Sequence, residues 1–222
     1  MEETHLDEFI SLDLFEREKV ICKRRMYKIY EIVNKKSNVK YIAKNMLKEI
    51  EDMTRYNLIE ISREVNNLLK FNHPGIQKLI GYSPINFKNK EKPVLITEYY
   101  SNSSLNKFLD KIQNDPSDTK KLIIIYGLAA AMSYLHSHEI IHCELHPENI
   151  YLDERLYPII CNFCSSGKIA DIKYMKLKGN PRYSSPEVLT DLKYSKSSDV
   201  FSFGMIVYKI MTNEEPFKDL EN

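Results

Sequence analysis

The four cysteines are the residues whose spacing first suggests chemistry. Cys161 and Cys164 are separated by two residues, the Cys-x-x-Cys spacing of a redox pair or of half a zinc site. A structural zinc site needs four ligands, and neither a second Cys-x-x-Cys pair nor a His-x-x-x-His pair follows them. No export signal accompanies them, so we expect Cys22, Cys143, Cys161 and Cys164 to be reduced. We interpret them as small buried apolar side chains and expect no zinc, with a cysteine-based metal or redox module as an alternative.

Composition limits the class of protein. The chain has 222 residues, 43% of them hydrophobic and 28% charged, which excludes a disordered, collagen-like or small disulfide-rich protein. Its 32 Lys and Arg against 31 Asp and Glu leave a net charge of +1, so we expect neither nucleic acid nor a membrane as a partner. The most apolar run, 122–135, is too short to span a membrane, and the acidic start does not resemble a secretory signal. These features predict a soluble cytoplasmic protein.

The first half of the chain is predicted to consist mainly of strands. Alternating β-branched and aromatic residues predict strands over 20–21, 27–33 and 39–46, and the polar turn at 34–38 makes the last two a hairpin. Apolar residues at helical spacing predict a helix over 58–71, which His73-Pro74-Gly75 ends. Two further strands are expected over 76–82 and 94–99.

The second half of the chain is predicted to be mostly helical. Helices are expected over 105–112, 120–138 and 199–212, with a linker at 114–118. The helix over 120–138 is apolar nearly all round, so we expect it to be buried. A β-rich part followed by a helical part predicts an α+β, two-lobed architecture.

A series of segments, in order, resembles motifs of the protein kinase family. The stretch 140–150, IIHCELHPENI, resembles the catalytic loop IIHRDLKPENI. Further segments resemble other sequence motifs of the family. They are Tyr41-Ile42-Ala43-Lys44, Arg63-Glu64-Val65, Asn162-Phe163-Cys164 in place of Asp-Phe-Gly, GNPRYSSPE at 179–187 and SDVFSFG at 198–204. The resemblance covers roughly 13–218. The amino-acid sequence at 95–99 and 198–204 is similar to that of the tyrosine-kinase-like branch of the family.

This resemblance implies a kinase-like domain over 13–222. It comprises a small β-rich N-lobe with one helix over about 13–98, a hinge over about 98–102, and a larger, mostly helical C-lobe over about 103–222. The likeness ends near Pro216, so we expect a truncated C-lobe that lacks its terminal helices, leaving an apolar face of the helix over 199–212 exposed.

The resemblance also implies a nucleotide site, which this sequence alters. Lys44 is expected to hold the ATP phosphates and to pair with Glu64. Side chains replace the glycines of the family's phosphate loop and should block the approach of a phosphate, and bulkier residues should make the adenine pocket smaller. The replaced glycines correspond to Cys22, Arg24 and Tyr27, and the remaining cofactor-binding positions are Ile21, Ile29, Ile42, Thr97, Glu98 and Tyr151.

The implied catalytic positions depart further from the family. Glu144 replaces the catalytic Asp, and a misplacement of about 1 Å can cost ~100-fold in rate. Asn149, the family's second metal ligand, is present, whereas Asn162 replaces the principal metal-binding Asp, so Mg²⁺ binding should weaken. In the same loop, Cys143 replaces an Arg and His146 replaces a Lys.

Retained packing with lost chemistry predicts a pseudokinase, a signalling scaffold or allosteric regulator with weak or absent ATP–Mg²⁺ binding. The alternative is an active or atypical protein kinase that uses Lys44, Glu144 and Asn149 to transfer the ATP γ-phosphate to protein Ser, Thr or Tyr. The expected partners are other signalling proteins, among them an active kinase or a second copy that covers the exposed face.

Overall fold

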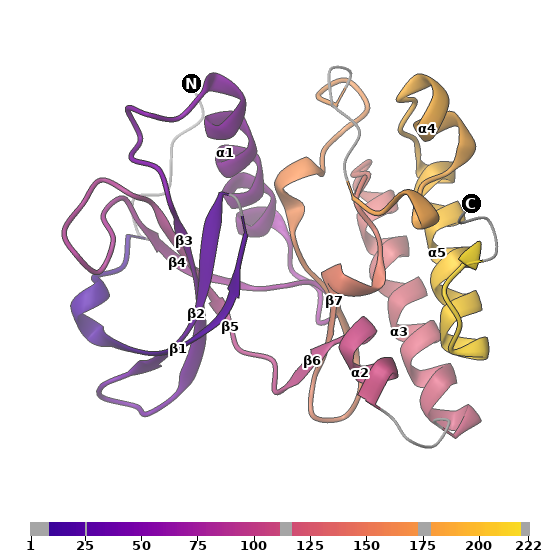
Figure 1. The fold of residues 1–222 in the computed structure, drawn as a ribbon, viewed down its shortest axis with the longest axis horizontal. Helices are drawn as coiled ribbons and strands as arrows, with labels where there is room; N and C mark the ends of the chain where they lie inside the picture. The colour runs from indigo at the N-terminus through magenta and orange to yellow at the C-terminus, as the bar shows by residue number, and fades with distance from the viewer. Residues whose placement is uncertain (1–8, 25, 112–116, 173–178, 219–222) are drawn as a thin grey trace. The chain divides into compact units, whose positions relative to one another are not determined.

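The computed structural model describes residues 9–24, 26–111, 117–172 and 179–218. The predicted helix end at Ile112 and most of the predicted linker at 114–118 lie outside the described residues. The chain divides into two compact units, a first unit made of 1–69 and 78–99 and a second unit made of 70–77 and 100–222. Most of the strands and one long α-helix lie in the first unit and the other described α-helices in the second, which confirms the predicted α+β class (Figure 1). Among the described residues, no helix is both long and apolar enough to cross a membrane.

The first unit is built on a five-stranded antiparallel sheet with the strand order β1-β2-β3-β5-β4. The hairpin predicted between β2 and β3 is confirmed, and its turn is held by the Asn34 side chain, which accepts hydrogen bonds from the backbone N–H groups of Lys36 and Ser37. The strands are β1 Phe15–Lys23, β2 Tyr27–Asn34, β3 Lys40–Met46, β4 Leu79–Ser83 and β5 Val94–Glu98.

Two strands begin three or more residues away from their predicted starts, for physical reasons. β1 begins at Phe15 rather than near Val20, because it is an edge strand whose residues 16–19 are charged and exposed and therefore show no apolar alternation. β4 begins at Leu79 rather than at Ile76. Ile76 instead forms a parallel bridge with Ile160 in the second unit, where the Gln77 N–H donates to the Ile160 carbonyl at 2.9 Å.

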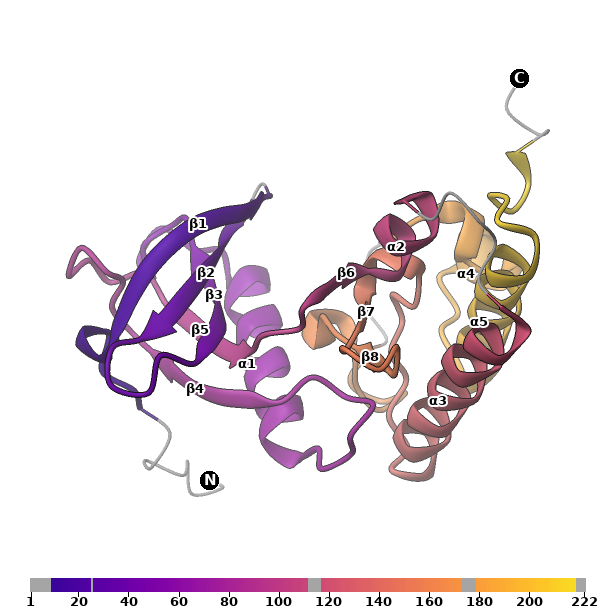
Figure 2. The ribbon, with the colours of Figure 1, turned by 90° about the horizontal axis from the view of Figure 1, so that it is seen from below.

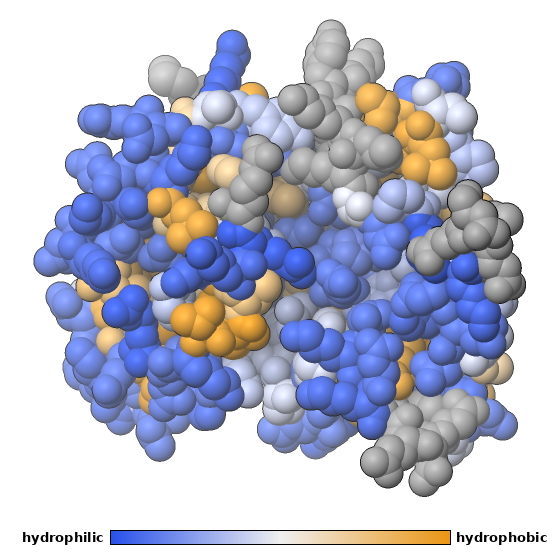
Figure 3. Space-filling view, viewed as in Figure 1, coloured by the Kyte–Doolittle hydropathy of each residue, from blue (hydrophilic) through white to orange (hydrophobic). Residues whose placement is uncertain are grey.

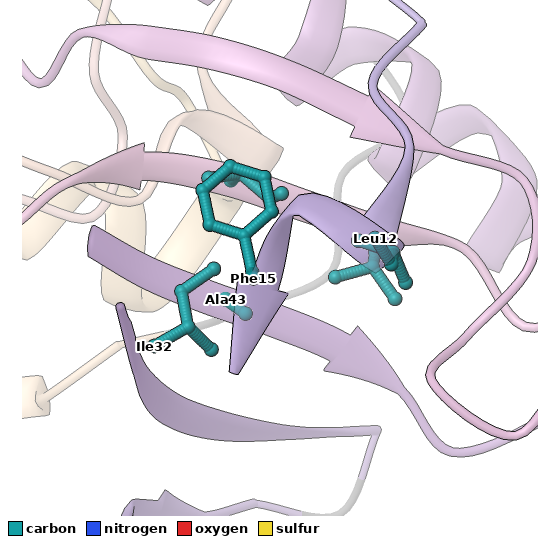
Figure 4. Close-up of a cluster of buried hydrophobic side chains, with 6 residues drawn as sticks. Leu12, Phe15, Ile32 and Ala43 are labelled. Carbon is teal, nitrogen blue, oxygen red and sulfur yellow. The ribbon is translucent and has the colours of Figure 1, made fainter. Parts of the chain in front are cut away.

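Each face of this sheet carries its own apolar cluster, because successive strand residues point to opposite faces. Beneath α1 (Arg55–Lys70), Met46 and Leu95 pack with Met53, and α1 contributes Ile61 and Val65 to this group. The cluster on the opposite face, shown in Figure 4, consists of Leu12, Phe15, Ile32, Ala43, Val94 and Ile96. The central strand β3 is thus packed from both sides, which fixes the direction of its side chains.

The second unit combines a small sheet with the remaining described helices. Its sheet has the order β6-β7-β8, and Figure 2 shows α3 and α5 side by side. The three-residue strands and the six-residue α4 escaped prediction because such short elements show no periodicity. The elements are β6 Asn102–Ser104, β7 Ile150–Leu152, β8 Pro158–Ile160, α2 Leu105–Lys111, α3 Asp118–Ser137, α4 Pro186–Asp191 and α5 Lys196–Thr212.

The long helices confirm their predicted positions but correct one expectation. α3 packs against β8 and α5, and Ile124 and Leu128 are fully buried. The expectation that α3 is buried all round is wrong, because Leu122 and Tyr126 are 63% and 79% exposed on the side that these two elements do not cover. α5 begins three residues earlier than predicted, since Ser195 caps it by accepting from the backbone N–H of Ser198.

Candidate active site in two halves

The predicted site residues are distributed over both units, and the half in the first unit centres on Lys44. Lys44 lies on β3, opposite Ile29 of β2 and Leu95 of β5. Its Nζ is 2.8 Å and 2.7 Å from Oε1 and Oε2 of Glu64 on α1. Both side chains are largely buried, so removing either partner would leave an uncompensated charge in a poorly solvated place. The pair predicted from the sequence is therefore assembled.

Strand register decides which predicted nucleotide-binding residues share the face of Lys44. Ile42 lies opposite Thr97, and both occupy the face that carries Lys44 and Ile29. Glu98 is the next residue after Thr97, so its side chain points to the opposite face, where it is half exposed with Oε1 3.9 Å from Lys78 Nζ.

The remaining two predicted positions are Ile21 on β1 and Tyr151 on β7. Ile21 is the extra residue of a β-bulge, because Val20 and Cys22 pair with the adjacent residues Tyr30 and Ile29. Tyr151 lies on β7 in the second unit, with its ring centroid 6.4 Å from that of Tyr100.

An aromatic contact on Lys44 was not anticipated from the sequence. The Tyr27 ring centroid lies 4.4 Å from Lys44 Nζ, which is a cation–π distance. From the sequence, Tyr27 is expected only to be a bulky replacement for a glycine. The signal that could have found the contact is the hairpin register, which places Tyr27 opposite Met46 and therefore diagonal to Lys44 on the same face.

The half in the second unit brings Glu144, Asn149 and Asn162 together. Asn162 Nδ2 donates to Glu144 Oε2 at 3.1 Å, and Asn149 Nδ2 donates to the Glu144 carbonyl at 2.8 Å. The buried Ser165 hydroxyl donates to Glu144 Oε1 at 2.6 Å. Ser165 could not be identified from the sequence as a partner of Glu144, because a serine 21 residues away carries no local signal of such a contact. Both carboxylate oxygens of Glu144 thus accept hydrogen bonds from the segment 162–165.

The two asparagines fit a divalent cation poorly. Mg²⁺ prefers negatively charged oxygen ligands in octahedral geometry. Asn162 turns its amide nitrogen to Glu144, while its Oδ1 accepts from the Cys164 thiol at 3.4 Å. Asn149 Nδ2 is also 3.0 Å from His146 Nε2. Within the described ranges, no group of three His, Cys, Asp or Glu side chains is arranged to hold a metal ion.

The loop that carries Glu144 is anchored from α5. The Asp199 carboxylate accepts from the backbone N–H groups of His142 and Cys143 at 2.8 Å and 3.1 Å, and it lies 3.0 Å from His136 Nε2. The buried His142 ring packs against Phe163 at 5.1 Å between centroids, and burial lowers the pKa of His142. The buried His142 ring and the Asp199 carboxylate therefore both anchor this loop. The scaffold of the site is therefore intact even where its chemical groups are altered.

The comparisons with known proteins agree with this scaffold. The family model of the protein kinase domain matches residues 15–222. The chain belongs to the protein kinase family. Members of this family use ATP and Mg²⁺.

The relatives that match this kinase domain are named kinases. The dual specificity protein kinase pyk3 of Dictyostelium discoideum is 34% identical over 161 residues, which is 72% of this chain and 11% of that protein. The carbon catabolite-derepressing protein kinase of Saccharomyces cerevisiae is 32% identical over 72% of this chain and 24% of its own length. The Aurora kinase of Saccharomyces cerevisiae is 28% identical over 95% of this chain and 56% of that protein. The chain thus spans between about a tenth and just over half of these relatives.

Proposed function

We propose that this kinase domain transfers phosphate poorly or not at all and acts as a signalling scaffold or allosteric regulator. The observation that carries the proposal is the engagement of Glu144. In the family, the carboxylate at this position accepts the proton of the substrate hydroxyl. Here both of its oxygens already accept hydrogen bonds, from Ser165 at 2.6 Å and from Asn162 at 3.1 Å. These bonds orient the carboxylate toward its own chain rather than toward an incoming hydroxyl.

The substituted metal ligand supports the same proposal. The amide of Asn162 supplies no negative charge for Mg²⁺, and its nitrogen is directed at Glu144. Glu144 and Asn162 are therefore hydrogen-bonded to each other, which favours a structural role for both. ATP and Mg²⁺ binding is expected to be weak or absent.

A second candidate function is an active or atypical protein kinase that transfers the ATP γ-phosphate to protein Ser, Thr or Tyr. The comparisons favour this candidate, because the relatives described above are all named as kinases. The assembled Lys44–Glu64 pair is also what phosphate binding at Lys44 would require. Lys44, Glu144 and Asn149 would be the residues that perform the transfer.

The proposal also covers the binding partners of this chain, its branch of the kinase family and its location in the cell. Val200 and Met211 on α5 are each about half exposed, which favours binding of another signalling protein or a second copy at this helix. The amino-acid sequence at 95–99 and 198–204 supports placing this chain near the tyrosine-kinase-like branch of the family. The names of the relatives do not indicate that branch. We expect the protein to act in the cytoplasm.

A phosphotransfer assay tests this proposal. The purified chain is incubated with radiolabelled ATP and either Mg²⁺ or Mn²⁺, with a generic protein substrate and with itself as acceptor. We expect the wild type to incorporate no more label than the Lys44→Ala variant. Lys28→Ala, on the neighbouring strand β2, is the matched control. Transfer by the wild type and by Lys28→Ala that Lys44→Ala abolishes would establish the active kinase instead.

A further inference from the structure

Tyr27 stands where the family resemblance places a glycine, and the sheet gives its side chain a defined neighbour. In the β2–β3 ladder, Ile29 lies opposite Lys44 and Tyr27 lies opposite Met46. Tyr27 is therefore one diagonal step from Lys44 on the same face, within reach of an aromatic side chain. Its ring centroid is 4.4 Å from Lys44 Nζ. The contact follows from strand register and does not depend on a loop.

The Lys44 ammonium is already coordinated by this chain. It has three N–H donors, and both oxygens of Glu64 lie within hydrogen-bond distance, at 2.8 Å and 2.7 Å. The negative face of the Tyr27 ring covers a further side of the ammonium. Only 12% of the Lys44 side chain is exposed. A phosphate that approached Lys44 on the side of the ring would therefore compete with Tyr27 for the ammonium.

The Tyr27 ring is itself held in place. It packs against the cluster of Met46, Met53 and Leu95 beneath α1. Ile61 and Val65 of α1 pack against the same cluster, so the ring and the helix that carries Glu64 share one apolar contact. Moving the ring away from Lys44 would expose apolar surface under α1, which is unfavourable.

We propose that Tyr27 is an internal ligand of Lys44 that takes the position of a nucleotide phosphate. Its ring holds the Lys44–Glu64 pair together without nucleotide and excludes ATP from Lys44. Tyr27 is a positioning residue in this scheme, because it acts through Lys44. The inference rests on the proposed function, since it names a cause for weak nucleotide binding, but it makes a separate claim about one side chain.

Substitution of Tyr27 tests this claim directly, with ATP in EDTA as the probe so that metal binding plays no part. Tyr27→Leu keeps an apolar side chain over the cluster but removes the aromatic face. We expect its affinity for ATP, measured by calorimetry and thermal shift, to rise by about tenfold over the wild type. Adding Lys44→Met to this variant should abolish the gain. Tyr27→Phe, which keeps the ring, should behave like the wild type.

Tyr30→Leu is the matched control, because Tyr30 is an aromatic residue of the same strand on the opposite face, where it packs against the cluster of Figure 4. It should cost stability without any gain in ATP affinity. Hydrogen exchange adds a readout that needs no nucleotide. The amides over 61–68 of α1 should lose protection in Tyr27→Leu and should keep it in Tyr30→Leu and Tyr27→Phe. Tyr27→Met, with a flexible apolar side chain, serves in place of Tyr27→Leu if that variant does not fold.

Two results would overturn the inference. One is tight, Lys44-dependent binding of ATP by the wild type, and the other is a folded Tyr27→Leu or Tyr27→Met protein with no gain in affinity for ATP. Failure of the proposed function is distinguishable, because phosphotransfer by the wild type contradicts that proposal. A wild type without transfer, combined with an unresponsive Tyr27→Leu variant, contradicts only the assignment of Tyr27.

Discussion

At the scale of single residues, a buried charge on β2 shows how strand register creates a local electrostatic site. The Glu31 side chain is 1% exposed, with Oε1 2.5 Å from Lys40 Nζ and Oε2 3.0 Å from Lys19 Nζ. Burial alone would raise the pKa of Glu31, but the hydrogen bond from Lys40 and the charges of Lys40 and Lys19 outweigh it and lower the pKa below its usual value of 4.5. The carboxylate therefore stabilises the fold in its charged form.

The Glu31→Gln variant tests this contribution through its pH dependence. A lowered pKa in the folded state means that the stabilisation is fully present above the unfolded value of about 4.5 and disappears as the pH falls through the folded pKa. We expect Glu31→Gln to lose about 1.5 kcal/mol of unfolding free energy near neutral pH. Urea denaturation should show this difference shrinking below about pH 4.5.

An exposed carboxylate on the neighbouring strand provides the control for this prediction. Glu16→Gln, on β1, should leave the free energy of unfolding nearly unchanged. A Glu31→Gln difference that stays constant down to acidic pH would contradict the assigned ion pairs.

At the scale of elements, two helical glycines differ in what surrounds them. An added Cβ at Gly127 of α3 would lie 2.6 Å from Pro158 Cδ and 2.9 Å from Pro158 Cγ on β8. At Gly204 of α5, nothing lies within 4 Å of the added atom. Gly127 thus permits the close approach of α3 to β8. At position 204 no close contact requires a glycine, which is an unfavourable residue inside a helix.

The pair of substitutions Gly127→Ala and Gly204→Ala separates packing from helix propensity. The helix propensity of alanine is more favourable than that of glycine by about 1 kcal/mol. Gly204→Ala should therefore raise the free energy of unfolding by up to that amount. Gly127→Ala gains the same propensity but forces α3 away from the rigid proline ring, and overpacking of this kind costs about 1–3 kcal/mol. Chemical denaturation should therefore show opposite signs for the two variants. Equal stabilisation by both would refute the close packing of α3 on β8.

At the scale of the whole molecule, an apolar patch lies at the end of α4. Figure 3 shows apolar side chains grouped over α4. Leu189 and Leu192, which we call the α4 patch, are 42% and 43% exposed. Leu192 also adopts φ 56, a left-handed conformation that is unfavourable for leucine. Exposure combined with backbone strain at one leucine favours a role in binding.

We expect the protein to self-associate through the α4 patch as its concentration rises. Light scattering coupled to size-exclusion chromatography should show a mass above the monomer value of 26.2 kDa. The double variant Leu189→Glu and Leu192→Asn should be monomeric, and asparagine tolerates the left-handed conformation of residue 192. Val39→Glu, a control at a 47% exposed apolar residue of the first unit, should associate like the wild type. A strictly monomeric wild type would rule out this use of the patch.

The class of fold, the long elements and the identity of the altered chemical groups could be predicted from the amino-acid sequence. Apolar periodicity is a local property, so α1, α3 and α5 could be located, and the replacements at Glu144 and Asn162 could be seen without coordinates. The contacts that those groups make depend on how distant parts of the folded chain come together. Glu144 meets Ser165 because a loop anchored by Asp199 places them together, and residues 21 apart carry no local signal of that contact. Tyr27 meets Lys44 because strand register sets diagonal neighbours, and register depends on the pairing of whole strands rather than on any one of them.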